Sequence, residues 1–464
     1  RELWTKHLTE LRVTGTRICL IVSKRIKIRH IPCNLKQDIA YIIIISLFLE
    51  KHMDRNKQIE SKKMCLLYFL RYFSDGCVYG FLPCYFLLAF TDTLEVGILL
   101  ASIPLSALLG NIIIGKLSKN EKRNLFLLKI FLPIESCFIC SIGFVNFSFA
   151  LTLIFSIIGN FFSMSMYNLL DATAGDINVE EHSKFSSMRC FGSLGYMFGA
   201  LVIGFVVKAF QGLNINSSSA YGYGFICILP IYLLLMSLTY WMKPYDLSLS
   251  HPETKNQSYS YKDLFKNKNF VLYTIIIAFL IGGLLFADNI YTDYWNLGNT
   301  EDNNPASLGM STALYEAVEF ITSLIVAALI SSSNLKAILS IGISASVLRF
   351  LGLGICTYID VKSVLGFGAS SIAILMATNS LRGIVFGCFA STFVPFLNEI
   401  VGIKLKTPGV FIVTMSYGLI NGIGQLVFKY MINGFKFVSG SSGHYPSFFL
   451  LAAIMTLLLL IRKR

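Results

Sequence analysis

Arg189 stands near the start of an apolar segment, 185–207, that is long enough to cross a membrane. Arg189, Ser193 and Tyr196 are spaced i, i+4, i+7, so they share one face of the expected helix. A cation, a hydroxyl and an aromatic ring on one face can hold a polar solute that contains a ring. An arginine at bilayer depth costs about 2.5–3.5 kcal/mol on insertion scales, so we expect it to face a cavity or to pair with an acid.

Two glutamates with helical spacing form a second candidate group. Glu316 and Glu319 are spaced i, i+3 in the apolar segment 307–331, and they can face Arg349 or Arg382 from later segments. Two carboxylates held close together share a proton readily, which suits a proton carrier. Pairing with the two arginines would instead neutralise them permanently. The sequence leaves both interpretations open.

Two more charged pairs lie in or beside apolar segments. Asp171 ends one such segment and Arg189 begins the next, so the two side chains can meet across a short loop. Arg71 and Asp75 are spaced i, i+4 and can pair within one helix, which we interpret mainly as structural.

The composition is that of a polytopic membrane protein. The chain has 464 residues, of which 55% are hydrophobic and 14% charged, whereas soluble domains carry about 25% charged residues. The net charge of +13 comes from basic residues scattered through short loops, which argues against nucleic-acid binding. The 11 cysteines lie mostly in apolar stretches and behave as small hydrophobes. We find no nucleophile–base pair, metal cluster or phosphate loop, so we expect neither an enzyme nor a cofactor or metal.

Twelve apolar segments follow one another, and the sequence therefore predicts an all-α membrane protein with twelve transmembrane helices. The alternate loops on one side hold only Lys208, Lys362 and Lys436, and the other side is rich in Lys and Arg, so we expect both termini in the cytoplasm. Tyr291, Tyr294 and Trp295 indicate an interfacial aromatic belt. The expected spans are 64–90, 95–115, 124–144, 147–171, 185–207, 221–242, 269–294, 307–331, 335–357, 367–398, 408–432 and 446–461.

The longest polar loop, 243–268, follows the sixth expected span and divides the chain into two six-helix bundles, 64–242 and 269–461. Paired six-helix halves around a midplane site are a common transporter plan. Residues 1–60 are basic, and their one apolar run is too short to span a bilayer. We expect them to form a cytoplasmic, partly disordered extension.

One segment of the sequence resembles the signature of a known transporter family. The run Phe185–Tyr196 resembles the span-five signature of the lactose-permease and nucleoside:proton symporter branch of the major facilitator superfamily. In lactose-permease-like members the matching arginine and aromatic residue hold the sugar, and a carboxylate pairs with that arginine. The resemblance thus implies a binding role for Arg189 and Tyr196, with Asp171 as the carboxylate. Glu316 and Arg349 fall on the span-eight glutamate and span-nine arginine of those members.

The second half is more similar to the nucleoside symporters. There Glu319 falls on their substrate-binding glutamate, and Asp288 or Asn289 falls on their span-seven asparagine. The similar runs are Leu264–Lys268, Leu348–Phe350, Ile384–Cys388 and Asn421–Gly424, and the resemblance as a whole covers about residues 64–460.

The chain departs from this branch at its proton-carrying positions. Arg382 stands where lactose-permease-like members have a histidine, Val385 where they have a proton-carrying glutamate, and Ser391 where nucleoside symporters have an acid. Ser118 or Lys119 replaces the usual aspartate of the gating loop. Proton coupling by the usual route is therefore doubtful, and the extra arginines favour an anionic solute such as a nucleotide.

We therefore expect a transporter that moves a nucleoside or nucleotide-like solute by alternating access. The sequence leaves open whether transport is coupled to an ion such as the proton. Its alternatives are a sugar or oligosaccharide symporter on the same fold and a transport-inactive sensor. We expect a monomer in the lipid bilayer, in the plasma membrane.

Overall fold

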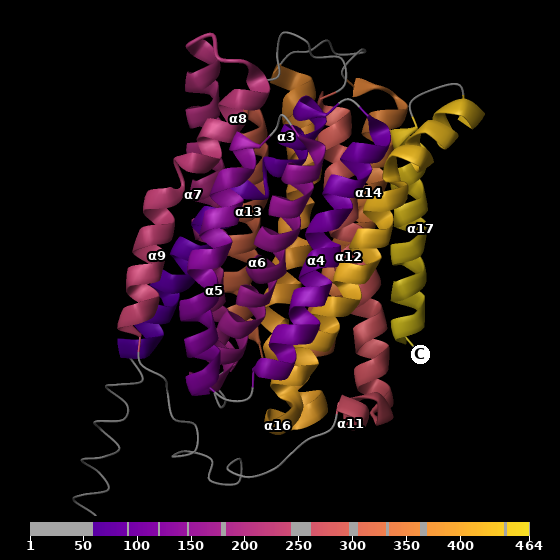
Figure 1. Ribbon diagram of the computed structural model, residues 1–464. Coiled ribbons are helices and arrows are strands. Elements are labelled where there is room, and N and C mark those ends of the chain that lie inside the picture. The colour runs from indigo at the N-terminus through magenta and orange to yellow at the C-terminus, as the bar shows by residue number, and fades with distance from the viewer. Residues whose placement is uncertain are drawn as a thin grey trace, which may run out of the picture. The chain divides into compact units, whose positions relative to one another are not determined.

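The computed structural model describes residues 59–90, 92–118, 121–145, 148–177, 182–242, 261–296, 305–330, 334–361, 369–439 and 443–463. The chain divides into two units at Lys62–Lys63, and the second, Lys63–Arg464, is a bundle of helices (Figure 1). The predicted extension 1–60, apart from its last two residues, and most of the predicted loop 243–268 lie outside the described residues.

Residues 63–78 are helical, and a turn at 79–81 separates them from α3. The labelled α-helices that follow are α3 (Leu82–Ala89), α4 (Thr93–Leu117), α5 (Glu121–Ser141), α6 (Phe149–Ile177), α7 (His182–Gly212), α8 (Ser217–Ile226), α9 (Leu229–Trp241), α11 (Tyr261–Lys266), α12 (Lys268–Asn296), α13 (Pro305–Leu329), α14 (Leu335–Tyr358), α16 (Ala369–Ser439) and α17 (His444–Lys463).

Eleven helical segments among the described residues are long and apolar enough to cross a membrane. They correspond to the expected spans from 95–115 onward, with bounds that shift by a few residues. The expected span 64–90 is interrupted at the turn before Pro83, so it is two helical pieces rather than one. The number twelve and the cytoplasmic placement of both termini stay predictions.

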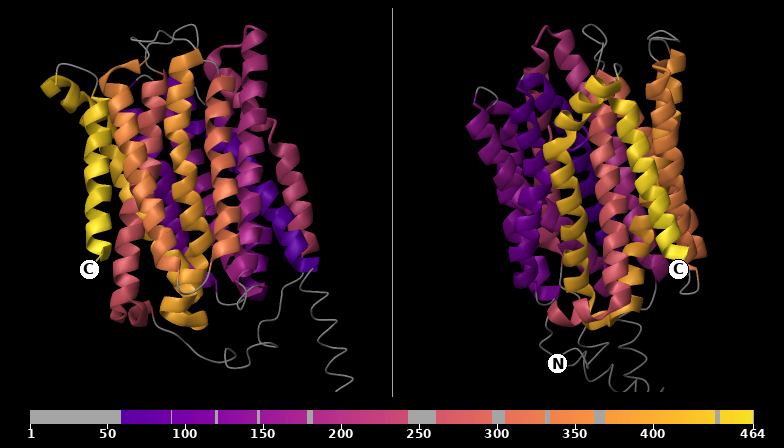
Figure 2. Two further views of the ribbon diagram at one scale, coloured as in Figure 1. Left: turned by 180° about the vertical axis from the view of Figure 1, so that it is seen from behind. Right: turned by 90° about the vertical axis from the view of Figure 1, so that its right-hand side faces the viewer.

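α16 contains two of these spans, Ser371–Gly402 and Leu405–Val427. Gly402 has φ 75°, a left-handed conformation that glycine adopts without steric cost and that turns the chain between them. The turn lies beside α11 at the lower end of Figure 1. In the right-hand view of Figure 2, the earliest helices gather on one side of the bundle and the last ones on the other.

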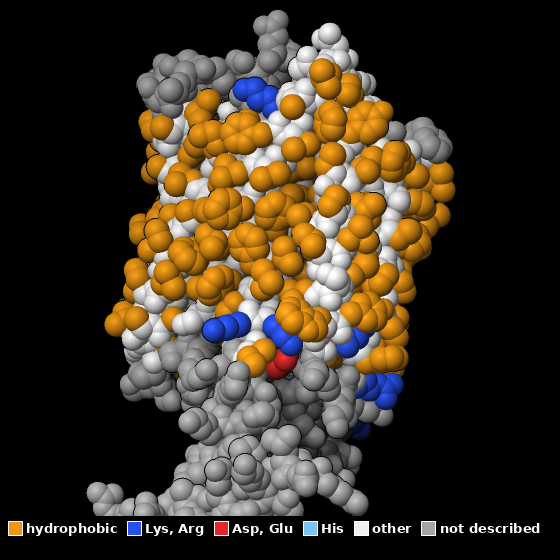
Figure 3. All heavy atoms as spheres, turned by 90° about the vertical axis from the view of Figure 1, so that its left-hand side faces the viewer, with side chains coloured by type: hydrophobic (Ala, Val, Ile, Leu, Met, Phe, Trp, Pro, Cys, Tyr) orange, Lys and Arg blue, Asp and Glu red, His pale blue; other side chains and the backbone are white. Residues whose placement is uncertain are grey.

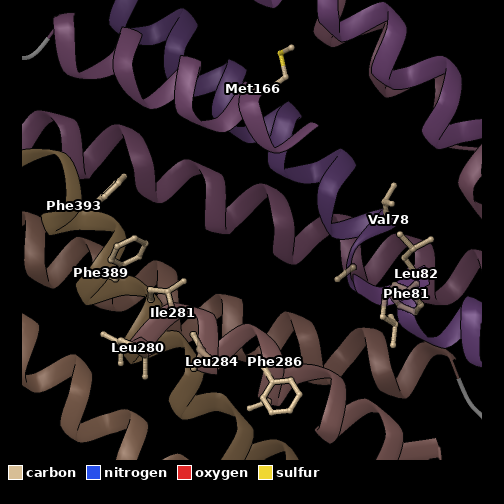
Figure 4. Packing of buried hydrophobic residues seen from close by; sticks show 14 of the residues in the cluster. Val78, Phe81, Leu82, Met166, Leu280, Ile281, Leu284, Phe286, Phe389 and Phe393 are labelled. Carbon is tan, nitrogen blue, oxygen red and sulfur yellow. The ribbon is translucent and has the colours of Figure 1, made fainter. Parts of the chain in front are cut away.

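The side chains are distributed as a lipid solvent requires. Large apolar residues such as Phe205, Leu233 and Leu348 are more than half exposed on the outside of the bundle. Figure 3 shows a face covered by apolar side chains, with Lys and Arg toward its ends. Charged residues within the spans, such as Arg71, Glu319 and Arg349, are instead buried in the bundle, where partners can satisfy them. Apolar packing also fills the interior: Leu280, Ile281 and Leu284 of α12 lie near Phe389 of α16 (Figure 4).

Two glycines set the distance between α7 and the helical residues 63–78. A Cβ atom at Gly195 or Gly199 would overlap the backbone of Phe69 or Phe73. Small residues thus let the two backbones approach closely, as in other membrane helix pairs. This contact turns the Arg189 face of α7 toward the bundle interior.

The expected aromatic belt at the end of α12 is wrong. Tyr291, Tyr294 and Trp295 are 4%, 4% and 7% exposed. Their polar atoms find partners inside the protein: the Tyr291 hydroxyl is hydrogen-bonded to Ser311 and that of Tyr294 donates to Asp360. Interior packing, rather than the membrane interface, therefore holds these rings.

Candidate functional site

A cavity of about 160 Å³ lies between α6, α7, α12, α13, α16 and the helical residues 63–78. Its wall is mixed, with tyrosine and phenylalanine rings beside charged groups. Six of the predicted site residues line it: Asp171, Arg189, Tyr196, Glu316, Glu319 and Arg382. A cavity with an apolar wall and a few polar groups is the usual form of a small-molecule site.

A second cavity of about 140 Å³ adjoins the first. Asp288 and Asn289 of α12 line it. Tyr196 and Arg382 line both cavities and stand between them. The two remaining predicted residues, Ser193 and Arg349, line neither cavity and contact residues that do.

Asp171 and Tyr72 contact Arg189 in the first cavity. Its Nε lies 3.9 Å from Asp171 Oδ1, so the expected pair forms at long range. Asp171 receives a closer bond from the Tyr68 hydroxyl, at 2.6 Å. The guanidinium lies over the Tyr72 ring, 4.3 Å from its centroid. Arg189 Nη1 is buried with no hydrogen-bond partner among the described residues, so this nitrogen is unsatisfied in this conformation.

Ser193 connects α7 to α13. Its hydroxyl donates to Glu319 Oε1 at 2.6 Å, and both side chains are buried. The sequence predicted that the Ser193 hydroxyl binds the solute, whereas in this structure it donates a hydrogen bond to the carboxylate of Glu319. A second such link, Thr414 to Asn168 at 2.8 Å, joins α16 to α6. Both hydrogen bonds connect the first part of the chain to the last.

Arg382 and Arg349 share one carboxylate. Asp288 accepts from Arg382 Nε through Oδ2 at 2.8 Å and from Arg349 Nη2 through Oδ1 at 2.6 Å. Asn379 Oδ1 accepts from Arg349 Nη2 at 2.7 Å, and Arg382 Nη1 donates to Glu316 Oε1 at 3.1 Å. Each arginine therefore binds a carboxylate in this conformation.

The two glutamates have different partners. Glu316 pairs with Arg382, whereas Glu319 has no cation within 4.0 Å among the described residues and is bound by Ser193. Arg349 faces neither glutamate, because Asp288 occupies it. Of the two interpretations left open by the sequence, neutralisation fits Glu316, and a carboxylate without an ion pair remains at Glu319.

Sequence reasoning missed several wall residues. Tyr72 and Tyr167 line the first cavity and Asn379 the second. A signal for Asn379 was present, because it lies three residues before Arg382 in the same apolar span and so shares its face. No comparable signal marked the tyrosines, because aromatic residues are common throughout these spans.

Residues 62–439 match the MFS_1 like family. No curated protein sequence matches the chain. Its structure is similar to the crystal structure of a variant of the nucleoside transporter NupG, with a TM-score of 0.64 and 15% identity over 87% of this chain and 99% of that one.

Two sugar transporters have the same fold. The proton:xylose symporter XylE bound to 6-bromo-6-deoxy-D-glucose has a TM-score of 0.62 and 14% identity, covering 89% of this chain and 95% of that one. The fucose:proton symporter FucP of E. coli has a TM-score of 0.58 and 13% identity, covering 88% of this chain and 100% of that one. At these identities the likeness concerns the fold alone. The family match covers most of the chain, so this protein belongs to the MFS_1 like family and is a transporter of the major facilitator superfamily, not an enzyme.

Proposed function

We propose that this protein moves a neutral solute with a ring and several hydroxyls, of the nucleoside class, across the membrane by alternating access. The observation that carries the proposal is the unsatisfied Nη1 of Arg189, a residue that lines a cavity together with Tyr72 and Tyr196. A guanidinium donor can bind a carbonyl or ring nitrogen of a base, and the tyrosine rings offer faces for stacking. The structurally similar protein NupG is a nucleoside transporter, which agrees with this class.

The charge balance around the cavities supports a neutral solute. Three arginines, Arg189, Arg349 and Arg382, face four carboxylates, and each arginine has a carboxylate within 4.0 Å. An anionic solute would have to displace one of these acids, which leaves a buried charge without its partner. For this reason we do not retain the nucleotide that the arginines suggested in the sequence. The four carboxylates are Asp171, Asp288, Glu316 and Glu319.

Alternating access requires contacts that can break as the two halves rock against each other. The hydrogen bonds Ser193–Glu319 and Thr414–Asn168 fit this role, because each joins a helix of the first half to one of the second. Both lie in or beside the first cavity, so a solute that enters can compete for them.

Uptake into proteoliposomes tests the proposal. We expect labelled uridine and adenosine to enter, while ATP does not, and we expect Arg189→Ala to abolish the uptake. Uptake of lactose alone would favour the second candidate, a sugar symporter, for which the similarity to XylE and FucP is the supporting observation. Binding without flux in sealed vesicles would favour a transport-inactive sensor.

A further inference from the structure

One arginine and two acids form a buried cluster between α5 and the helical residues 63–78. Arg71 Nη1 contacts Glu135 Oε1 at 2.5 Å, and Arg71 Nε lies 3.2 Å from Asp75 Oδ2. The three side chains are 3%, 0% and 0% exposed. The expected pair of Arg71 and Asp75 is therefore present, and Glu135 joins it as a second acid that the sequence did not place there.

The cluster contains one carboxylate more than its arginine can neutralise. No other lysine or arginine of the described chain lies within 4.0 Å of either acid. Oε2 of Glu135 is buried without a hydrogen-bond partner in the same part of the chain, and both oxygens of Asp75 are buried beside the Tyr167 hydroxyl. An uncompensated carboxylate is strongly disfavoured in a membrane interior, and a bound proton removes the charge.

Hydrogen bonds connect the cluster to the cavities. Arg71 Nη2 donates to Ser163 Oγ at 2.8 Å, and the same oxygen accepts from the Tyr79 hydroxyl at 2.7 Å. Tyr79 lines both cavities. It lies in the turn that interrupts the first span, so the break in the helix lets this side chain reach from the cavity wall toward Ser163.

We propose that Asp75 and Glu135 form a proton-binding site: Arg71 neutralises one carboxylate and a proton bound between or on the two acids neutralises the other. The site lies in the first half of the chain, away from the span-ten positions where the acids of the related symporters are missing. It does not depend on which solute the cavities take. Arg71 and Ser163 tie the site to Tyr79 in the cavity wall.

The other titratable groups around the two acids do not compete for this role. Phenols and buried thiols keep their protons between about pH 5 and about pH 8, and Arg189 stays charged. The two carboxylic acids are therefore the groups of this cluster whose charge a bound proton can remove. The groups that face them are Tyr72, Cys77, Tyr79, Cys140, Tyr167, Arg189, Tyr196 and Tyr232.

Thermal unfolding of the purified protein between about pH 5 and about pH 8 tests the site without any solute. A group that holds its proton more tightly in the folded than in the unfolded protein stabilises the fold at low pH, and this contribution is lost as the pH rises. We expect the Tm of the wild type to fall with rising pH. Asp75→Asn removes the excess charge, so its Tm should fall less and exceed that of the wild type at the alkaline end.

Glu135→Gln is the second variant. Arg71 then faces Asp75 alone, so we expect the Tm of this variant to depend less on pH than that of the wild type. Asp263→Asn, an acid-to-amide change on an exposed residue of α11, is the control that should follow the wild type. If the Tm of both Asp75→Asn and Glu135→Gln fell with rising pH as steeply as that of the wild type, the proposal would be overturned. A Tm that responds to sodium at constant pH and not to pH itself would also overturn it, because the bound ion would then be sodium.

Transport gives a second readout. With uridine as the probe, we expect Asp75→Asn to lose accumulation driven by a pH gradient while it retains exchange of uridine across the membrane. If the wild type carries no uridine, the proposed solute is wrong, and the pH dependence of Tm still decides the proton site.

Discussion

At Arg189 we expect the planar geometry of the guanidinium to matter as much as its charge. Asp171 and Tyr72 contact the guanidinium, and Nη1 has no hydrogen-bond partner among the described residues. We predict that Arg189→Lys abolishes uridine binding, because an ammonium group cannot keep the first contacts and offer a second donor in the same plane. Loss of the uridine-induced rise in Tm would show this.

Arg123→Lys, the same exchange at an exposed position of α5, is the matched control and should bind as the wild type does. Retained transport in Arg189→Lys would mean that a positive charge alone suffices at this position.

Gly192 gives a test that leaves the arginine in place. A Cβ at this position would lie 2.8 Å from Arg189 Nη1 and 3.1 Å from the Tyr72 ring. The guanidinium end is flexible and can move, so we predict that Gly192→Ala folds normally and binds uridine more weakly. Gly212→Ala on the same helix, where a Cβ meets nothing within 4 Å, is the control. Equal affinity in the two variants would remove Nη1 from the binding site.

Between elements, the hydrogen bond from Ser193 to Glu319 joins α7 to α13. Ser193→Ala leaves a buried carboxylate without its donor, which costs about 1–3 kcal/mol. We predict a lower Tm for this variant, and a smaller loss for the double variant Ser193→Ala/Glu319→Gln, because the amide removes the charge. Ser237→Ala, which removes an exposed hydroxyl from α9, should have no effect. Additive losses in the double variant would show that the two residues do not interact energetically.

The helices themselves were largely predictable. Spans of about 20 apolar residues identify membrane helices because an unsatisfied backbone group in lipid is so costly that only helices and closed barrels cross. The interruption at 79–81 and the merger of two spans through Gly402 were not predicted. Both depend on backbone conformations at single residues, which hydropathy does not report.

On the scale of the whole molecule, we infer that the charge balance of the cavities selects neutral solutes. We predict that uridine and adenosine raise the Tm of the purified protein and that uridine monophosphate and ATP do not. Binding at one hundred times Kd stabilises the native state by about 2.7 kcal/mol, which a thermal-shift assay detects. If the nucleotides raised the Tm more than the nucleosides did, the three arginines would be identified as binding sites for an anionic solute. The expected monomer and the plasma membrane stay predictions.

The sequence by itself determined the membrane class of the chain, nearly all of its spans and the charged residues that are buried in the bundle, because apolar length and the cost of an intramembrane charge are local properties of the chain. It also predicted the two pairs with short separation, Asp171 with Arg189 and Arg71 with Asp75. Only the tertiary structure decided that Asp288 bridges Arg349 and Arg382, that Ser193 holds Glu319, and that Glu135 joins Arg71. These contacts join helices far apart in the sequence, and the faces on which such helices meet follow from the packing of the whole bundle.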